Sequence, residues 1–292
     1  MVRKTACGIA LVILMLVLGS CVKERRIRVG SKNFTEQIIL GELIALLIER
    51  DLRVPVDRLL NLGGIEIAHQ ALISNQIDLY PEYTATAVAM VLKQEIVPDR
   101  AALLQNCRNE YGSRFEAEWL DPLGFDNSFV MVASGERARQ LGIVNLSEAA
   151  QADPGWKMGV GYEFENRKDG MPALQKAYRL PLAAAPKIMD LGLLYKALAD
   201  KQVDLVAANA TDGLLSTMDV KILLDDQNVF PPYEAAIVAR RSALEEVKGL
   251  RAVLNKLSGK ISSDTMRRLN YEVDGKKRAP RAVAAEFLAT LK

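Results

Sequence analysis

The chain has 292 residues, half of them hydrophobic, with 38 basic and 36 acidic residues. The first 20 residues contain two bases and no acid, so the remaining chain has 36 of each and no formal net charge. This balance argues against a general nucleic-acid binder, which needs a basic excess. The single histidine, His69, argues against a histidine-rich metal site, and we expect no metal or cofactor. The hydrophobic content is enough to bury a full core, which we expect to divide into two lobes.

Residues 1–20 have the layout of a secretory signal: two bases, then an unbroken apolar run over 9–18, then small residues. The run is too short for an ordinary transmembrane helix but suits a signal core. Leu18-Gly19-Ser20-Cys21 resembles the bacterial lipobox, so we predict that Cys21 carries a lipid anchor. The alternative is an ordinary signal followed by a cysteine by chance. With Cys7 and Cys21 consumed, Cys107 is the one remaining thiol; it allows no internal disulfide and suits a buried, inert position.

The first half of the chain alternates strand and helix patterns. Strands are predicted over 26–30, 54–60 and 77–80, and helices over 37–49, 65–74 and 83–92. Ser31 or Asn33 is expected to cap the first helix. Such alternation predicts a largely parallel α/β lobe.

The pattern restarts after Pro122. Strands are predicted over 128–133, 157–161, 203–208 and 220–224, with a helix over 191–199 and helices from 242 onward. Two crossings, near Phe125–Asn127 and Phe230–Tyr233, join two α/β lobes into a hinged clamshell. The predicted boundaries are 21–126 plus 232–292 for the first lobe and 127–231 for the second, after the signal over 1–20.

Aromatic, hydroxyl and lysine side chains gather at two predicted strand-to-helix turns, over 30–37 and 79–87. Ligands of parallel sheets bind beyond the carboxyl ends of the strands, where these turns lie. Together these groups suit a small zwitterion, because a cation rests on a ring face and an anion meets donors.

Five segments in order closely resemble the substrate-binding proteins of bacterial osmoprotectant importers, over about residues 26–292. They are 29–37, 80–87, Glu163-Phe164 with Arg167 and Asp169-Gly170, 210–213, and 230–233. The resemblance implies a two-lobed α/β periplasmic-binding-protein fold of type II, the clamshell type. It implies a monomeric, extracytoplasmic lipoprotein that performs no chemistry. Its partners would be the membrane, through the lipid anchor, an ABC permease with its ATPase, and a solute such as glycine betaine, choline or carnitine.

The resemblance also implies site residues. Lys32, Thr86 and Arg167 would hold the solute's carboxylate, and Tyr83 and Tyr233 would be two walls of an aromatic box for the quaternary ammonium. Because Lys32, Tyr83 and Thr86 fall in the first lobe and Arg167 in the second, the solute would favour closure.

Two of the expected site positions depart from the family's pattern. Phe129 stands where an aromatic hydroxyl is common, and Asn209 where a tyrosine is common. Ile65 also follows the glycine pair where threonine or serine is usual. These changes leave open a weaker betaine binder, or a binder of a larger betaine such as carnitine or ergothioneine.

Plainer interpretations remain for each residue. Lys32 suits a solvated turn, Tyr83 suits packing, Thr86 suits backbone capping, and Arg167 suits a surface pair with Glu163 or Asp169. Tyr233 follows two prolines and suits a hinge spacer, while Asn209 and Asp212 suit caps of the next helix. Two other functions also remain: a secreted two-lobed enzyme, and a ligand-sensing module that docks on a receptor. An enzyme needs an acid or base with a shifted pKa in the cleft. In the sequence, neither a Ser-His-Asp set nor a pair of carboxylates stands out.

Overall fold

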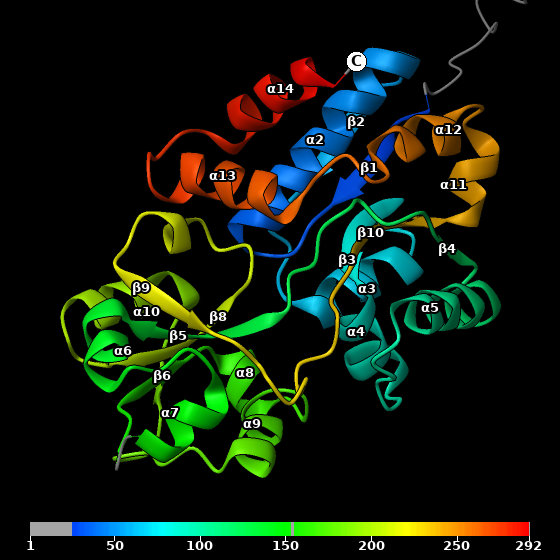
Figure 1. The fold of residues 1–292 in the computed structure, drawn as a ribbon. Coiled ribbons are helices and arrows are strands. Elements are labelled where there is room, and N and C mark those ends of the chain that lie inside the picture. Colours follow the sequence, from blue (N-terminus) through cyan, green and yellow to red (C-terminus); the bar gives the residue numbers. More distant parts are fainter. Residues whose placement is uncertain (1–24, 153–154, 292) are drawn as a thin grey trace, which may run out of the picture.

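The computed structural model describes residues 25–152 and 155–291; the predicted signal over 1–20 and the predicted anchor Cys21 lie outside them. Within the described residues, no helix combines the length and hydrophobicity needed to cross a membrane. The chain forms two α/β lobes, each around its own five-stranded sheet, which confirms the predicted fold class (Figure 1).

The sheet of the first lobe has the order β2-β1-β3-β10-β4. β1 pairs in parallel with β2 and β3, whereas β10 is antiparallel to both β3 and β4. The first three strands are parallel because helices connect them, and β10 runs the other way because the chain re-enters from the second lobe. The strands are β1 (Ile27–Gly30), β2 (Val56–Leu59), β3 (Leu79–Tyr83), β4 (Ala117–Trp119) and β10 (Ala235–Arg240).

Helix α2 (Thr35–Leu52) is the central helix of the first lobe. Leu40, Leu43, Ile44 and Leu47 recur at helical spacing and are buried in its core. The carboxy-terminal helices pack back onto α2, as Figure 1 shows in orange and red. The other helices are α3 (Ile65–Ile73), α4 (Thr84–Thr86), the π-helix η1 (Ala87–Leu92), α5 (Arg100–Arg114), α11 (Arg241–Glu246), α12 (Leu250–Leu254), the 3₁₀ turn η3 (Asn255–Leu257), α13 (Ser263–Asp274) and α14 (Pro280–Thr290).

The sheet of the second lobe has the order β7-β6-β8-β5-β9. β6 is parallel to β7 and β8, and β5 is antiparallel to β8 and β9. Its strands are β5 (Phe129–Ser134), β6 (Met158–Val160), β7 (Lys187–Ile188), β8 (Leu205–Asn209) and β9 (Val220–Leu223). Its helices are α6 (Gly135–Leu141), α7 (Leu146–Ala152), α8 (Tyr162–Asn166), α9 (Met171–Tyr178), α10 (Leu191–Ala199) and the 3₁₀ turn η2 (Gly213–Ser216).

The two crossings run side by side between the lobes (Figure 1). Asp126 and Glu234 form an antiparallel bridge, and the Asn127 N–H donates to the Tyr233 carbonyl at 3.1 Å. The crossings therefore support each other as one hinge. The boundaries at 126/127 and 231/232 stay predictions.

The structure corrects two local predictions. Neither Ser31 nor Asn33 caps α2: the residue at the cap is Phe34, and the Ser31 hydroxyl accepts from the Asn61 N–H at 2.9 Å instead. The third strand does not end at Tyr80 but runs to Tyr83, and the helix starts one residue later than predicted. The distant strand β10 explains the extension, since it pairs with β3 as far as Tyr83.

Candidate ligand cleft

Lys32 and Tyr83 lie together at the ends of two neighbouring parallel strands, because Lys32 follows β1 and Tyr83 ends β3. The Lys32 Nζ is 4.4 Å from the centre of the Tyr83 ring and 2.5 Å from Glu82 Oε1. All three side chains are buried. Lys32 is therefore neither a solvated turn residue nor a free cation: it neutralises a buried carboxylate and rests on a ring face.

Arg167 connects the two lobes. It follows α8 in the second lobe, and its Nη1 donates to Thr86 Oγ1 of the first lobe at 3.4 Å. Its Nε and Nη2 donate to the two carboxylate oxygens of Asp169 at 2.9 and 2.6 Å. Burial opposes the charge, but the paired Asp169 holds the pKa of Arg167 above its ordinary value. The predicted pairing with Asp169 is present, and because Arg167 is 5% exposed it is no surface pair.

Tyr233 and Phe129 complete the surroundings of this guanidinium. Tyr233 Oη accepts from Arg167 Nη2 at 3.2 Å and donates to Asp169 Oδ2 at 2.5 Å. The Arg167 Cζ is 5.3 Å from the Phe129 ring centre and 5.4 Å from that of Tyr233. Asn209 lies directly opposite Phe129 in the β5–β8 ladder. The second lobe and the hinge thus bring four predicted residues together: Phe129, Arg167, Asn209 and Tyr233.

The sequence predicted no aromatic contact for Phe164 or Phe230, but the structure places both rings beside Phe129. The Phe129 ring meets the Phe164 ring edge-on at 5.0 Å and the Phe230 ring at 6.2 Å between centres. Both residues lie in segments that resemble the family, Glu163-Phe164 and 230–233. The resemblance therefore pointed to these segments, though not to these two rings. The ring cluster therefore consists of Phe129, Phe164, Phe230 and Tyr233.

The two groups of residues meet where the lobes touch. Thr86 stands one turn after Tyr83 in the chain and contacts Arg167 across the lobes. A side-chain carbon added at Gly64 of the first lobe would lie 3.8 Å from Glu163 Oε1 of the second lobe. The lobes are therefore closed on each other along this line.

One of the plainer interpretations made Asp212 a cap of the next helix. The structure shows no capping hydrogen bond from the Asp212 side chain to η2. Its Oδ2 accepts instead from the Asn209 N–H at 3.1 Å and from the Tyr195 hydroxyl at 2.9 Å. Burial raises the pKa of Asp212 to about 6. Asp212 thereby fixes the end of β8 and the position of Asn209 beside the ring cluster.

Asn209→Tyr is expected to strengthen binding of glycine betaine, because it adds a ring face beside Phe129. An additional cation–π contact contributes roughly 0.5–2 kcal/mol. Calorimetric titration of the variant beside the parent measures this gain. Unchanged affinity would place Asn209 outside the box.

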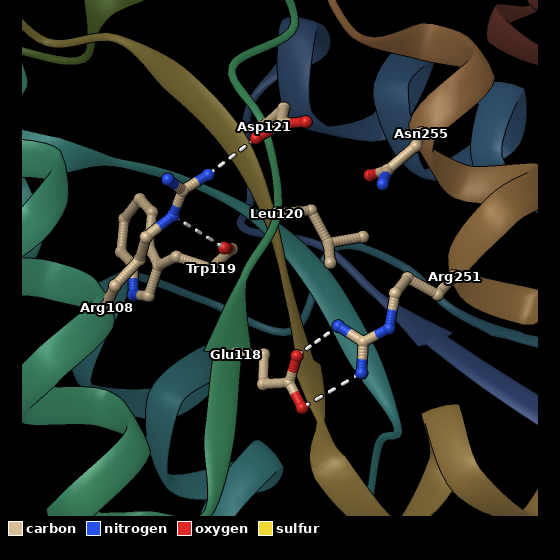
Figure 2. A pocket seen from close by; sticks show the side chains of 7 residues that line it. All are labelled: Arg108, Glu118, Trp119, Leu120, Asp121, Arg251 and Asn255. Carbon is tan, nitrogen blue, oxygen red and sulfur yellow. Dashed lines mark hydrogen bonds and ion pairs between the residues drawn. The ribbon is translucent and has the colours of Figure 1, made fainter.

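A separate hollow of about 340 Å³ lies on the first lobe, away from this cleft (Figure 2). Its charged side chains are already paired with one another, Arg108 with Asp121 and Arg251 with Glu118, as the dashed lines show. None of the predicted site residues lines it. The hollow therefore offers no free charge for a zwitterion.

Comparison with known proteins agrees with this architecture. The family described as the substrate-binding domain of the ABC-type glycine betaine transport system matches residues 25–290. The carnitine transport binding protein OpuCC of Listeria monocytogenes is 34% identical over 275 residues, 93% of this chain and 88% of that protein.

A second relative is named for a different solute. The ergothioneine transport permease/ergothioneine binding protein EgtU of Helicobacter pylori is 33% identical over 279 residues, 95% of this chain. This chain spans only half of that protein's length.

Among solved structures, a glycine betaine/carnitine/choline ABC transporter structure superposes with a TM-score of 0.80 and 31% identity, covering 90% of this chain and 97% of the other. The family match over residues 25–290 spans both lobes and both crossings. The chain therefore belongs to the family of substrate-binding domains of ABC-type glycine betaine transport systems.

Proposed function

We propose that the protein captures a quaternary-ammonium zwitterion of the betaine and carnitine type by closing its two lobes. The observation that carries this proposal is the position of Arg167. Asp169 fixes one edge of its guanidinium through Nε and Nη2, and Nη1 lies beside Thr86 of the opposite lobe. A carboxylate that accepts from both Nη1 and Thr86 Oγ1 would meet donors from both lobes only when the lobes are closed.

The ring faces supply the second half of the recognition. Lys32 lies 4.4 Å from the ring centre of Tyr83, and Arg167 lies 5.3 and 5.4 Å from those of Phe129 and Tyr233. The surroundings of these rings therefore stabilise a cation. A trimethylammonium has no N–H to donate, and ring faces within about 6 Å are its natural contacts. The proposed ligand residues are Lys32, Tyr83, Thr86, Phe129, Arg167, Asn209 and Tyr233.

A larger betaine such as ergothioneine is the second candidate. Phe129 lacks a hydroxyl and Asn209 brings an amide, and the two are neighbours on adjacent strands. The resemblance to a relative named for ergothioneine supports this candidate. An amide beside the box suits a solute with an additional hydrogen-bonding group.

The proposal includes no catalysis. His69, the one histidine, packs edge-on against Tyr111 and Phe115, and burial lowers its pKa to about 4. Cys107 is buried too, and burial raises its pKa to about 12. Neither group therefore suits a general base or a nucleophile near neutral pH.

The cellular setting is also proposed. We infer a monomer held outside the cytoplasm by a lipid on Cys21, delivering solute to an ABC permease driven by its ATPase. The signal pattern over 1–20 and the family membership support this setting. Labelling cells with a radioactive fatty acid tests the anchor: Cys21→Ser should abolish incorporation.

The solute is tested by calorimetric titration of the mature chain, with Cys21 removed. The panel is glycine betaine, choline, carnitine, proline betaine and ergothioneine. Micromolar binding of glycine betaine, carnitine, proline betaine or ergothioneine without turnover supports the proposal and names the solute, whereas choline has no carboxylate and is the control for that group. Millimolar or absent binding across the panel contradicts it.

A further inference from the structure

A buried carboxylate, Glu36, lies where the lobes and the hinge meet. Its Oε1 accepts from Tyr83 Oη at 2.6 Å and from Asn127 Nδ2 at 3.0 Å. Its Oε2 accepts from Asn270 Nδ2 at 3.1 Å and lies 2.5 Å from Thr211 Oγ1. All five side chains are at least nine-tenths buried. Glu36, Tyr83 and Asn270 belong to the first lobe, Asn127 to a crossing and Thr211 to the second lobe.

Two of these contacts, to Thr211 and to Asn127, form a closed triangle with a third contact between Thr211 and Asn127. Glu36 Oε2 meets Thr211 Oγ1, Thr211 Oγ1 meets the Asn127 amide at 2.7 Å, and that amide returns to Glu36 Oε1. Each contact needs one hydrogen. The Thr211 hydroxyl has one, and the Asn127 amide offers its nitrogen to one neighbour and its oxygen to the other. Two hydrogens therefore serve three contacts.

Reversing the Asn127 amide does not change this count. With the amide nitrogen toward Thr211, its oxygen faces Glu36 Oε1, and that contact lacks a hydrogen instead. In both orientations, all three contacts can be hydrogen bonds only if Glu36 supplies the missing hydrogen. Tyr83 and Asn270 donate from outside the triangle and leave the deficit in place.

We propose that Glu36 carries a proton in the closed cleft and acts as a positioning residue that holds Tyr83 of the first lobe and Thr211 of the second in register. The acid O–H donates to the triangle, and the remaining lone pairs accept from Tyr83, Asn127 and Asn270. A neutral group is also the less costly occupant of this dry junction. The pKa of Glu36 is raised by burial, which agrees with the hydrogen count.

The charged and titratable groups around Glu36 come from several elements. Lys32, after β1, opposes protonation through its charge, whereas Asp212, before η2, interacts unfavourably with an ionised Glu36. Asp274, on α13, accepts from Thr35 at 2.6 Å, and Tyr83 faces Glu36 from β3. Lys32 is already paired with Glu82 at 2.5 Å, which weakens its effect on Glu36.

The sign of the pH dependence follows from a folded pKa above the unfolded value. The stabilisation is complete below the unfolded pKa, near 4.3, and is lost as pH rises through the folded pKa. Between these two values, loss of the Glu36 stabilisation raises the unfolding equilibrium constant about tenfold for each unit by which the pH rises.

Glu36→Gln tests this proposal, because the amide supplies the missing hydrogen without a titratable proton. Urea unfolding of parent and variant from pH 5 to pH 8 should show a loss of stability with rising pH in the parent that the variant lacks. Infrared spectra should show a protonated carboxylic-acid band in the parent that is missing in Glu36→Gln. Asp212→Asn is the matched control, since it removes a partly buried acid nearby that takes no part in the triangle, and it should keep the Glu36 dependence.

Three results would overturn the proposal. One is parallel pH profiles for the parent and Glu36→Gln. Another is an acid band of equal strength in both proteins. The third is failure of Glu36→Gln to fold, since a neutral amide should satisfy the triangle. None of these readouts requires a solute, so they stand apart from the identity of the ligand.

Discussion

Arg167→Ala is expected to weaken solute binding by about 3 kcal/mol, roughly a hundredfold. The variant loses the fork that would meet the solute's carboxylate, and it leaves Asp169 without its bidentate partner. Tyr233, which donates to Asp169, loses its guanidinium neighbour as well. Calorimetric titration with the tightest-binding compound of the panel measures the loss.

Two further variants make this result specific. Arg139→Ala removes an arginine of the same lobe whose pairing with Asp219 is exposed to solvent, and it should leave the affinity unchanged. Phe129→Tyr keeps the ring and should change affinity less than Arg167→Ala. An Arg167→Ala protein that binds as tightly as the parent would show that the carboxylate lies elsewhere.

Lys32→Met is expected to lower the free energy of unfolding by about 3–5 kcal/mol. The methionine keeps the aliphatic stem but removes the charge that neutralises Glu82, whose side chain is fully buried. Burial raises the pKa of Glu82, and without Lys32 this rise should increase. The variant should therefore regain stability at low pH and lose it as pH rises through the folded pKa of Glu82. Urea unfolding at acid and neutral pH measures both effects.

The double variant Lys32→Met/Glu82→Gln separates charge from packing. It should recover most of the loss, because no unpaired charge stays buried. Lys201→Met is the matched control: its pairing with Glu136 is exposed, and its removal should leave the free energy of unfolding nearly unchanged. If the double variant were as unstable as Lys32→Met alone, the ion pair would not be the cause.

The sequence by itself determined the alternation of strands and helices, the two-lobed fold class and the family. These features follow from the local spacing of apolar residues, as along α2, and from motifs of a few residues each that follow one another in the family's order. The same reasoning selected residues that lie close together where the lobes meet, since strand ends of a parallel sheet share an edge.

Only the tertiary structure decided which charges pair. Lys32 meets Glu82, which is 50 positions away in the chain, and Glu36 meets Thr211, which is 175 positions away. Arg167 binds Asp169 closely, while Glu163 stays 3.9 Å away, a choice that the sequence left open. Burial and long-range strand pairing make these choices, because the cost of a dry charge depends on neighbours brought from other elements.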